Sequence, residues 1–464
     1  MSLLDKESCE CGRSELELFD LPGTQASIEE TRYESYFPIS STDRGGPIEF
    51  RIMLGPDDYI AMDDCVLYLR VRILDENGEA LPESEEIIVR YKDANNADAE
   101  RRARQIPEKS VVFPVNNFIA SAFRQVEVHL GSTPIGTSDN MYAYRGYIEN
   151  LIASSKDNKK TQLDIGLFAL DTGDFDEHDR TVALGEATNK GAEKRYTKTK
   201  NSKAFECIGR IHNEMFLQDK LLLSKVPISV KLHRADDNFL LMSMNGNQQY
   251  RIQYEKAKLI VNVKKIASHV REAHEVKLNE MNAKYPVRRI EVKHFTRGSE
   301  RSDISEPNLV NGTLPKRIFI GIVRTDSFNG DRHLNPYNFD HHNVNYVALR
   351  QNGQSVPREP FILDFNAGVA GEAYLAFLQA IHVWNSPHTN GVTRSAFVSG
   401  STFYAFNLAQ DESIGDNFNL VKEGNLSLDI RLKTPSRTSL TLICFMEYES
   451  IVEIDKDRNV YYNE

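Results

Sequence analysis

The most constraining feature of the sequence is a two-residue alternation of apolar and polar side chains that recurs along most of the chain. Clear examples are residues 66–74, "VLYLRVRIL", and residues 426–433, "LSLDIRLK". Successive side chains of a β-strand point to opposite faces, so this alternation indicates strands with one buried and one solvated face. Pro, Gly and Asn lie near the ends of these segments, as is typical of turns. The sequence therefore predicts a protein built mainly of short strands.

The segments between the strands indicate how the strands connect. Parallel sheets need a crossover helix after nearly every strand, and the sequence does not show that regularity. Helical apolar stripes occur at residues 141–152 and 369–381, with a weaker candidate at 266–282. We therefore expect an all-β fold of antiparallel sandwiches, each with about eight strands, and a few short helices in the loops. A double jelly roll is the architecture that this organisation favours, although periodicity alone does not give the strand order.

The alternating segments form two series, separated by a plausible joint at residues 244–250, "MNGNQQY". Residues before the first series are polar and interrupted by turn formers. We therefore expect an N-terminal arm at residues 1–45, a first jelly roll at residues 46–245 and a second jelly roll at residues 246–464.

Two segments of the first series are highly charged and poor in apolar residues, namely residues 91–109 and most of residues 156–203. Such segments cannot bury much apolar surface. We expect both to be exposed excursions from the core.

Charge and apolar content limit the partners of the chain. It has 56 Lys and Arg against 67 Asp and Glu, a net charge of −11, and no long basic run. Nucleic-acid binding, which needs clustered basic side chains, is therefore not expected as its main task. The sequence has no apolar run of about 18 residues and no signal-peptide pattern, so we expect synthesis and use in the interior of a cell or a particle, without membrane insertion. The five scattered cysteines fit a reducing compartment.

Histidines concentrate in residues 333–357, which raises the question of a metal or acid–base site. His341 and His342 are adjacent and would point to opposite faces of a strand, so they could not easily share an ion. An alternating segment follows them, and Asn352 and Gly353 then form a typical hairpin turn. A loop, a strand and a tight turn is the favoured interpretation.

Residues 171–173, "DTG", match the tripeptide that carries the catalytic aspartate of aspartic proteases. Those enzymes need two such carboxylates sharing a proton, and this chain has only one unless a dimer supplies the other. Because the acidic run continues to Asp179, we expect a solvated loop.

Other candidate sites are weaker. His269 and His274 match no zinc-protease spacing and would turn to different faces of a surface helix. Cys9 and Cys11 lack a second pair of ligands at zinc-site spacing. Nucleotide-binding glycine loops with their lysine are also absent from the sequence. We predict no catalytic, cofactor-binding or metal-binding residues and no cofactor, and hence a chain that is not an enzyme.

Longer segments carry a specific resemblance. They run in order from about Pro47 to the C-terminus, and include "FPVNNFIASAFRQVEVHLGSTPIGTSDNMYAYRGYIENLI", "NAKYPVRRIEVKHFT", "LPKRIFIGIVRTDSFNGDRHLNPYNFDHHNVNYVAL", "FNLVKEGNLSLDIRLKTP" and "VEIDKDRNVYYN". These segments resemble the major capsid protein family of Polinton (Maverick) elements and the related adintoviruses. The charged residues 85–110 and 156–203 and the Cys-containing arm do not match that family.

The resemblance implies a structural protein of a virion capsid. Its subunit would be a double jelly roll, and three subunits would form a hexon-like, pseudo-hexagonal capsomer that tiles an icosahedral shell. The implied partners are further copies of the chain and a single jelly-roll penton protein at the vertices. No catalytic residues come with the resemblance.

Two alternatives come from other classes of protein. A jelly-roll carbohydrate-binding module or glycan-active enzyme would use an exposed aromatic platform, for which Trp384 is the single available tryptophan. A vertex or spike protein is the other alternative, although a penton needs only one jelly roll and the chain is long enough for two.

Overall fold

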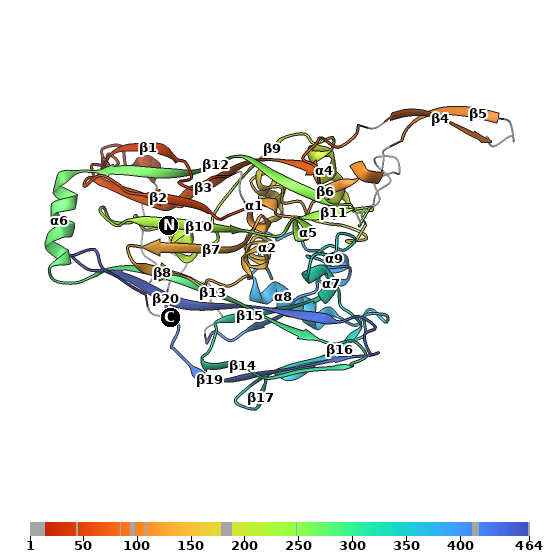
Figure 1. Cartoon of the computed structure of the whole chain (residues 1–464). Helices are drawn as coiled ribbons and strands as arrows, with labels where there is room; N and C mark the ends of the chain where they lie inside the picture. Colours follow the sequence, from red (N-terminus) through yellow and green to blue (C-terminus); the bar gives the residue numbers. More distant parts are fainter. Residues whose placement is uncertain are drawn as a thin grey trace.

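A computed structural model describes residues 14–42, 45–83, 85–92, 98–105, 108–177, 188–246, 248–410 and 417–462, with only the backbone described at 85–92, 98–105 and 108. Within these residues, strands form four large antiparallel sheets that lie in successive layers from top to bottom in Figure 1. The expected all-β architecture is confirmed.

The N-terminal half contributes two of these sheets. Their strands, in spatial order, are β1 (Ile28–Tyr36), β12 (Tyr250–Ile266), β3 (Asp58–Asp75) and β9 (Phe205–Gly209), then β2 (Ile48–Ile52), β10 (Ile228–Arg234), β7 (Phe123–Leu130) and β8 (Thr133–Ile135). A short pair, β6 (Val112–Pro114) with β11 (Leu241–Ser243), lies beside them.

The C-terminal half contributes the other two sheets. Their strands, in spatial order, are β13 (Ala283–Arg297), β20 (Leu440–Ile454), β15 (Arg317–Arg324) and β18 (Tyr404–Asn407), with β21 (Val460–Tyr462) on β20, then β14 (Asp303–Thr313), β19 (Glu423–Leu432), β16 (Val344–Gln351) and β17 (Gln354–Ile362).

The alternating segments of the sequence form strands because their apolar side chains share one face. On β19, Leu426, Leu428 and Ile430 are almost fully buried, and the residues between them are partly exposed. A two-residue period places such side chains on the core side of a sheet. The buried apolar residues of all four sheets form one continuous core.

The strand pairings bear on the expected boundaries between the parts of the chain. Strand β12, which follows residue 246, pairs with β1 and β3 of the N-terminal half. Strand β1 lies within the expected arm, yet it forms the edge of that sheet. Helix α6 (Ser268–Leu278) then connects β12 to β13 at the left end of the molecule (Figure 1). The passage between the two halves therefore runs through α6.

Short helices fill the loops. They include α1 (Phe118–Ser121), α2 (Tyr142–Ala153), α3 (Lys156–Lys160), α4 (Lys190–Thr199), α5 (Asp237–Leu240), α7 (Thr325–Phe328), α8 (Gly371–Ala380) and α9 (Arg394–Val398). Helices α2, α6 and α8 coincide with the three apolar stripes of the sequence. None of the helices in the described residues is long and apolar enough to span a bilayer.

The two charged segments behave differently from each other. Strands β4 (Glu85–Lys92) and β5 (Asp98–Gln105) pair as a hairpin that projects from the body of the molecule (Figure 1), in agreement with an excursion. The expectation of exposure is wrong for parts of residues 156–203, because Lys159, Arg195 and Tyr196 are almost fully buried. Partners elsewhere in the chain compensate the polar groups of Lys159 and Arg195, as described below.

Candidate functional site

The histidine-rich segment forms a loop, a strand and a turn, as predicted. His341 and His342 precede strand β16, and Asn352 and Gly353 form the tip between β16 and β17 with left-handed φ values of 50° and 84°. The two histidines lie in a turn rather than on the strand, and the His341 ring stacks on Phe365 with centroids 4.2 Å apart. Burial lowers the pKa of His342, which favours its neutral form.

The "DTG" aspartate is buried, so the expectation of a solvated loop is wrong for this residue. The Asp171 carboxylate lies 3.0 Å from Nη2 of Arg195 on α4, and Asn335 Nδ2 donates to it at 3.2 Å. Arg195 also donates to the carbonyl oxygen of Pro114 at 3.0 Å. Asp171 therefore connects a loop of the first half to residues 331–340 of the second half, and its charge is paired with Arg195.

His269 and His274 lie on α6, whose residues are mostly exposed, as expected for a surface helix. The His274 ring nitrogen Nδ1 lies 3.0 Å from the hydroxyl of Tyr59. Trp384 follows α8 and is 52% exposed. Cys9 and Cys11 lie outside the described residues. Within the part of the chain that is described, no group of three or more His, Cys, Asp and Glu side chains is arranged to hold a metal ion.

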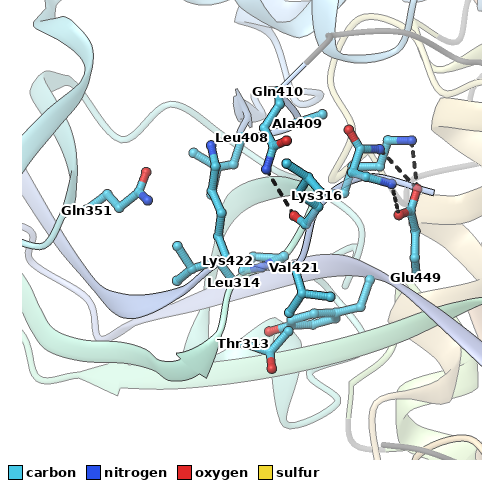
Figure 2. A pocket seen from close by; sticks show the side chains of 14 residues that line it. Thr313, Leu314, Lys316, Gln351, Leu408, Ala409, Gln410, Val421, Lys422 and Glu449 are labelled. Atoms are coloured by element: carbon cyan, nitrogen blue, oxygen red, sulfur yellow. Dashed lines mark hydrogen bonds and ion pairs between the residues drawn. The ribbon is translucent and has the colours of Figure 1, made fainter. Parts of the chain in front are cut away.

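A small cavity of about 60 Å³ lies beside strand β15 between residues 313–316, 408–410 and 419–422 (Figure 2). Glu449 accepts hydrogen bonds there from Lys316 Nζ at 3.1 Å and from the Asn419 backbone at 2.7 Å. Ligand pockets usually enclose about 300–1,000 Å³, so this cavity has room only for water. The Glu449 carboxylate holds a loop in place.

The richest polar arrangement lies where the two halves meet, a region we call the junction. Glu149 on α2 pairs with His212 Nδ1 and with Arg288 Nη2 on β13, both at 2.8 Å. Arg288 also reaches Glu447 on β20 at 3.1 Å, and Glu447 lies 2.6 Å from Arg317 on β15. Acidic and basic groups thus alternate across the boundary between the halves. Their sequence separation explains why no motif revealed them.

The electrostatics of the junction favour the charged forms. Burial alone would raise the pKa of Glu149, but the hydrogen bond and charge of His212, with the charges of Arg288 and Arg145, lower it to about 2. A second pair lies alongside, in which Arg145 Nη1 contacts Glu214 Oε1 at 3.1 Å. Buried ion pairs of this kind are favourable only with near-ideal geometry, because each charge has lost its hydration.

A cavity of about 450 Å³ adjoins this network and is lined in part by Glu149, His212 and Arg288. Both ring nitrogens of His212 are engaged, Nδ1 with Glu149 and Nε2 with the side-chain amide of Asn150 at 3.4 Å. A general base needs a ring nitrogen within reach of a substrate proton. We interpret His212 as a bridging group rather than a reacting one.

Aromatic rings complete the junction. Tyr147 on α2 stacks on Tyr337 of the second half with centroids 4.1 Å apart and planes 9° apart. Tyr144 stacks on Phe328 at 5.6 Å. The Tyr337 hydroxyl is hydrogen-bonded to Ser121, so its polar end is satisfied inside the core. Ring pairs of this kind contribute about 0.5–1.5 kcal/mol beyond the area that they bury, and they join the two halves.

Lys159 forms a further link between the halves. Its Nζ donates to the carbonyl oxygens of Leu151 and Asn390, both at 2.6 Å, and the residue is only 2% exposed. Burial lowers its pKa to about 7. The link therefore consists of hydrogen bonds from a lysine whose charge is poorly solvated.

Comparisons with known proteins identify the class of fold. No protein-family model matches the sequence. A Caenorhabditis elegans protein described as "Uncharacterized protein F54H12.2" is 24% identical over 445 residues, which cover 95% of this chain and 98% of that protein.

Solved structures of viral capsids resemble the whole chain. The Sputnik virophage structure matches with a TM-score of 0.64, 9% identity, and coverage of 100% of this chain and 94% of that chain. The Faustovirus major capsid protein matches with a TM-score of 0.54, 9% identity, and coverage of 95% and 93%. The mavirus major capsid protein matches with a TM-score of 0.52, 9% identity, and coverage of 100% and 97%. The chain therefore has the double jelly-roll fold, and its structural neighbours are viral major capsid proteins.

Proposed function

We propose that the protein is a major capsid protein of the Polinton and adintovirus lineage, and that three copies form a pseudo-hexagonal capsomer of an icosahedral shell. The observation that carries this proposal is the fold match over the whole chain to viral major capsid proteins. A subunit with two similar sheet pairs presents two blocks, so a threefold arrangement presents six. Such a capsomer can fill hexagonal positions through nearly equivalent contacts.

The junction supports this proposal because a capsomer subunit must keep its two sheet pairs in a constant relative orientation. Glu149 of the first half pairs with Arg288 of the second half at 2.8 Å, and this contact depends on the relative position of the two halves. The two blocks of the subunit are thereby held in one orientation. We further propose jelly-roll boundaries that follow the strand pairings, with residues 28–266 in the first unit and residues 283–462 in the second.

Exposed apolar side chains offer contacts between copies. Phe418, Leu420 and Val421 are 53%, 77% and 78% exposed and lie close together on one loop. Exposed apolar clusters commonly mark protein interfaces, and an obligate trimer interface typically buries about 2,000 Å² or more. The proposed partners are copies of the same chain and a single jelly-roll penton protein, in a virion capsid and without an enzymatic role.

The mass of the purified chain tests the proposal. We expect light scattering to give three times the chain mass of 52.8 kDa, and negative-stain images to show compact hexagonal outlines. Replacing Leu420 and Val421 by Asp should weaken association between copies if this loop lies at an interface. A chain that stays monomeric across salt and pH would contradict the proposal.

The glycan-binding alternative rests on Trp384, which is exposed enough to serve as a platform. A glycan-array signal that disappears with Trp384→Ala would favour that alternative. The same exposure also suits a contact with a neighbouring copy, and the whole-chain fold match favours the capsid function.

A further inference from the structure

An apolar groove of about 540 Å³ lies at the α6 end of the molecule, where both halves contribute to one surface. Tyr59 and Ile266 come from the first half, Tyr285 comes from the second, and Val270 and Met281 come from the connection through α6. Met281 remains 54% exposed. Exposed apolar surface of this kind commonly marks a docking site, because covering it removes apolar area from water.

The rim of the groove is basic. Lys220, Lys277 and Lys284 all line it. The pair of Lys277 and Glu280 is 60% and 61% exposed, so it contributes little to stability and is easily exchanged for another partner. An occupant that carries apolar side chains together with carboxylates would therefore match both the floor and the rim.

The N-terminal arm has that composition. Residues 14–21 read "SELELFDL". Leu16, Leu18, Phe19 and Leu21 are 75%, 77%, 96% and 91% exposed, so most of their apolar surface contacts solvent. Burying it would contribute about 25 cal/mol per Å². The acidic residues between these side chains are Glu15, Glu17 and Asp20.

The arm leaves its own copy at the edge of that copy's groove, which Ser27 and Ile28 line. Gln25 holds the exit in one conformation, because its Oε1 accepts from the backbone nitrogen of Ile28 at 2.8 Å and its Nε2 donates to the carbonyl oxygen of Ile28 at 3.1 Å. In this conformation the apolar side chains of the arm stay outside the groove.

We propose that residues 14–21 of one copy dock in the α6 groove of a neighbouring copy. The leucines and Phe19 cover the apolar floor, and the carboxylates pair with the lysines of the rim. Exchange of an arm between identical subunits is a low-cost way of linking them, because each copy supplies both the arm and the groove. The inference rests on the proposed function, since a capsid supplies the neighbouring copies.

Two single-cysteine chains test the proposal directly. One carries Leu18→Cys and the other carries Met281→Cys, both in a background with Cys9→Ser and Cys11→Ser, and the two are co-expressed. Cys65, Cys207 and Cys444 are buried and can stay. Under mild oxidation we expect a disulfide-linked heterodimer on a non-reducing gel. Val276→Cys is the matched control, because Val276 is 64% exposed on α6 but does not line the groove, and it should give at least fivefold less product.

Charge reversal adds a second measurement. Lys284→Glu in the groove chain should reduce the disulfide yield severalfold, and Glu17→Lys in the arm chain should restore it. Restoration would show that the two charges meet, which a general change in folding cannot produce.

The outcomes separate this inference from the proposed function. Trimers without the heterodimer would overturn arm exchange and leave the capsid function standing, whereas monomers without the heterodimer would contradict both. A chain with both cysteines that forms only an internal disulfide would show the arm in its own groove, and would also overturn the proposal. A co-purified lipid in the groove, seen as added mass, together with absence of the heterodimer would do the same.

Discussion

The junction and the α6 groove are both built from residues of the two halves, yet their chemistry is opposite. At the junction, the side chains of Glu149 and Glu447 are only 5% and 4% exposed and each is paired with basic groups. At the groove the floor is apolar and open, and charged side chains stand exposed at the rim, as Lys277 does. The junction, which is completed within one chain, is polar and specific. The groove, which is open in one chain, suits contact with another chain.

The physical reason for this difference lies in the cost of burying charge. A buried ion pair is favourable only with near-ideal geometry, which a covalently connected chain can maintain. An apolar contact tolerates small shifts and so suits neighbours that meet at nearly equivalent positions. The difference predicts that substitutions at the junction affect the stability of one chain, whereas substitutions at the groove affect association.

The largest effect is expected for Glu447→Ala at the junction. Removing this carboxylate takes away the charge partner of Arg317, whose side chain is 14% exposed, whereas Arg288 keeps its pair with Glu149. Loss of one member of a buried ion pair typically costs about 3–5 kcal/mol. Denaturant unfolding should show a loss of that size. Glu29→Ala, which breaks an exposed pair with Lys265, is the control and should leave the free energy of unfolding almost unchanged.

The next prediction concerns pH and Lys159. Burial lowers the pKa of Lys159 to about 7 in the folded chain, from an ordinary value of 10.5. Between these values the unfolded chain binds more protons, so raising the pH through that window stabilises the fold. Urea midpoints should therefore rise from pH 7 to 9.5, and Lys159→Met should flatten that rise. Equal slopes in the two proteins would contradict the assignment.

A smaller effect is expected for Tyr337→Phe. The ring keeps its stacking on Tyr147, but the hydrogen bond to Ser121 is lost inside the core. A buried hydrogen bond of this kind contributes about 1 kcal/mol. Thermal unfolding should show a modest decrease. An unchanged melting temperature would indicate that the stacking alone carries this contact.

The smallest effect on a single chain is expected for Val270→Asp in the groove. Val270 is half-buried on a surface helix, so the free energy of unfolding should fall by no more than about 1 kcal/mol. The yield of the arm–groove disulfide should nevertheless fall severalfold. Val276→Asp on the outer face of α6 is the matched control for both measurements.

Local patterns in the sequence predicted the elements that depend on local physics. The alternation of residues 66–74 and 426–433 predicted strands where β3 and β19 lie, and Asn352 with Gly353 predicted the hairpin tip. Strand β14 escaped prediction because its sequence, "DISEPNLVNGT", is largely polar. Pairing with β19 and burial of a few side chains, such as Leu309 and Val310, make it a strand.

Contacts between distant residues explain the wrong predictions. Asp171 and Lys159 lie in charged segments that alone indicate exposure. Each is buried because a partner far along the chain satisfies its polar group, Arg195 and Asn335 for Asp171 and the carbonyl of Asn390 for Lys159. The composition of a segment indicates only its average exposure. Burial of a single charged side chain depends on whether one particular partner lies within hydrogen-bonding distance.

By itself, the sequence determined the strand-rich class, many of the strands and the helices α2, α6 and α8, because side-chain periodicity and turn chemistry act over a few residues. Only the tertiary structure decided that β12 joins the first sheet, that alternating charges connect the halves, and that Ser27 and Ile28, just after the acidic and apolar residues 14–21, line an apolar groove with lysines at its rim. These features depend on which distant segments meet in space, and that is set by packing of the whole core rather than by any local pattern.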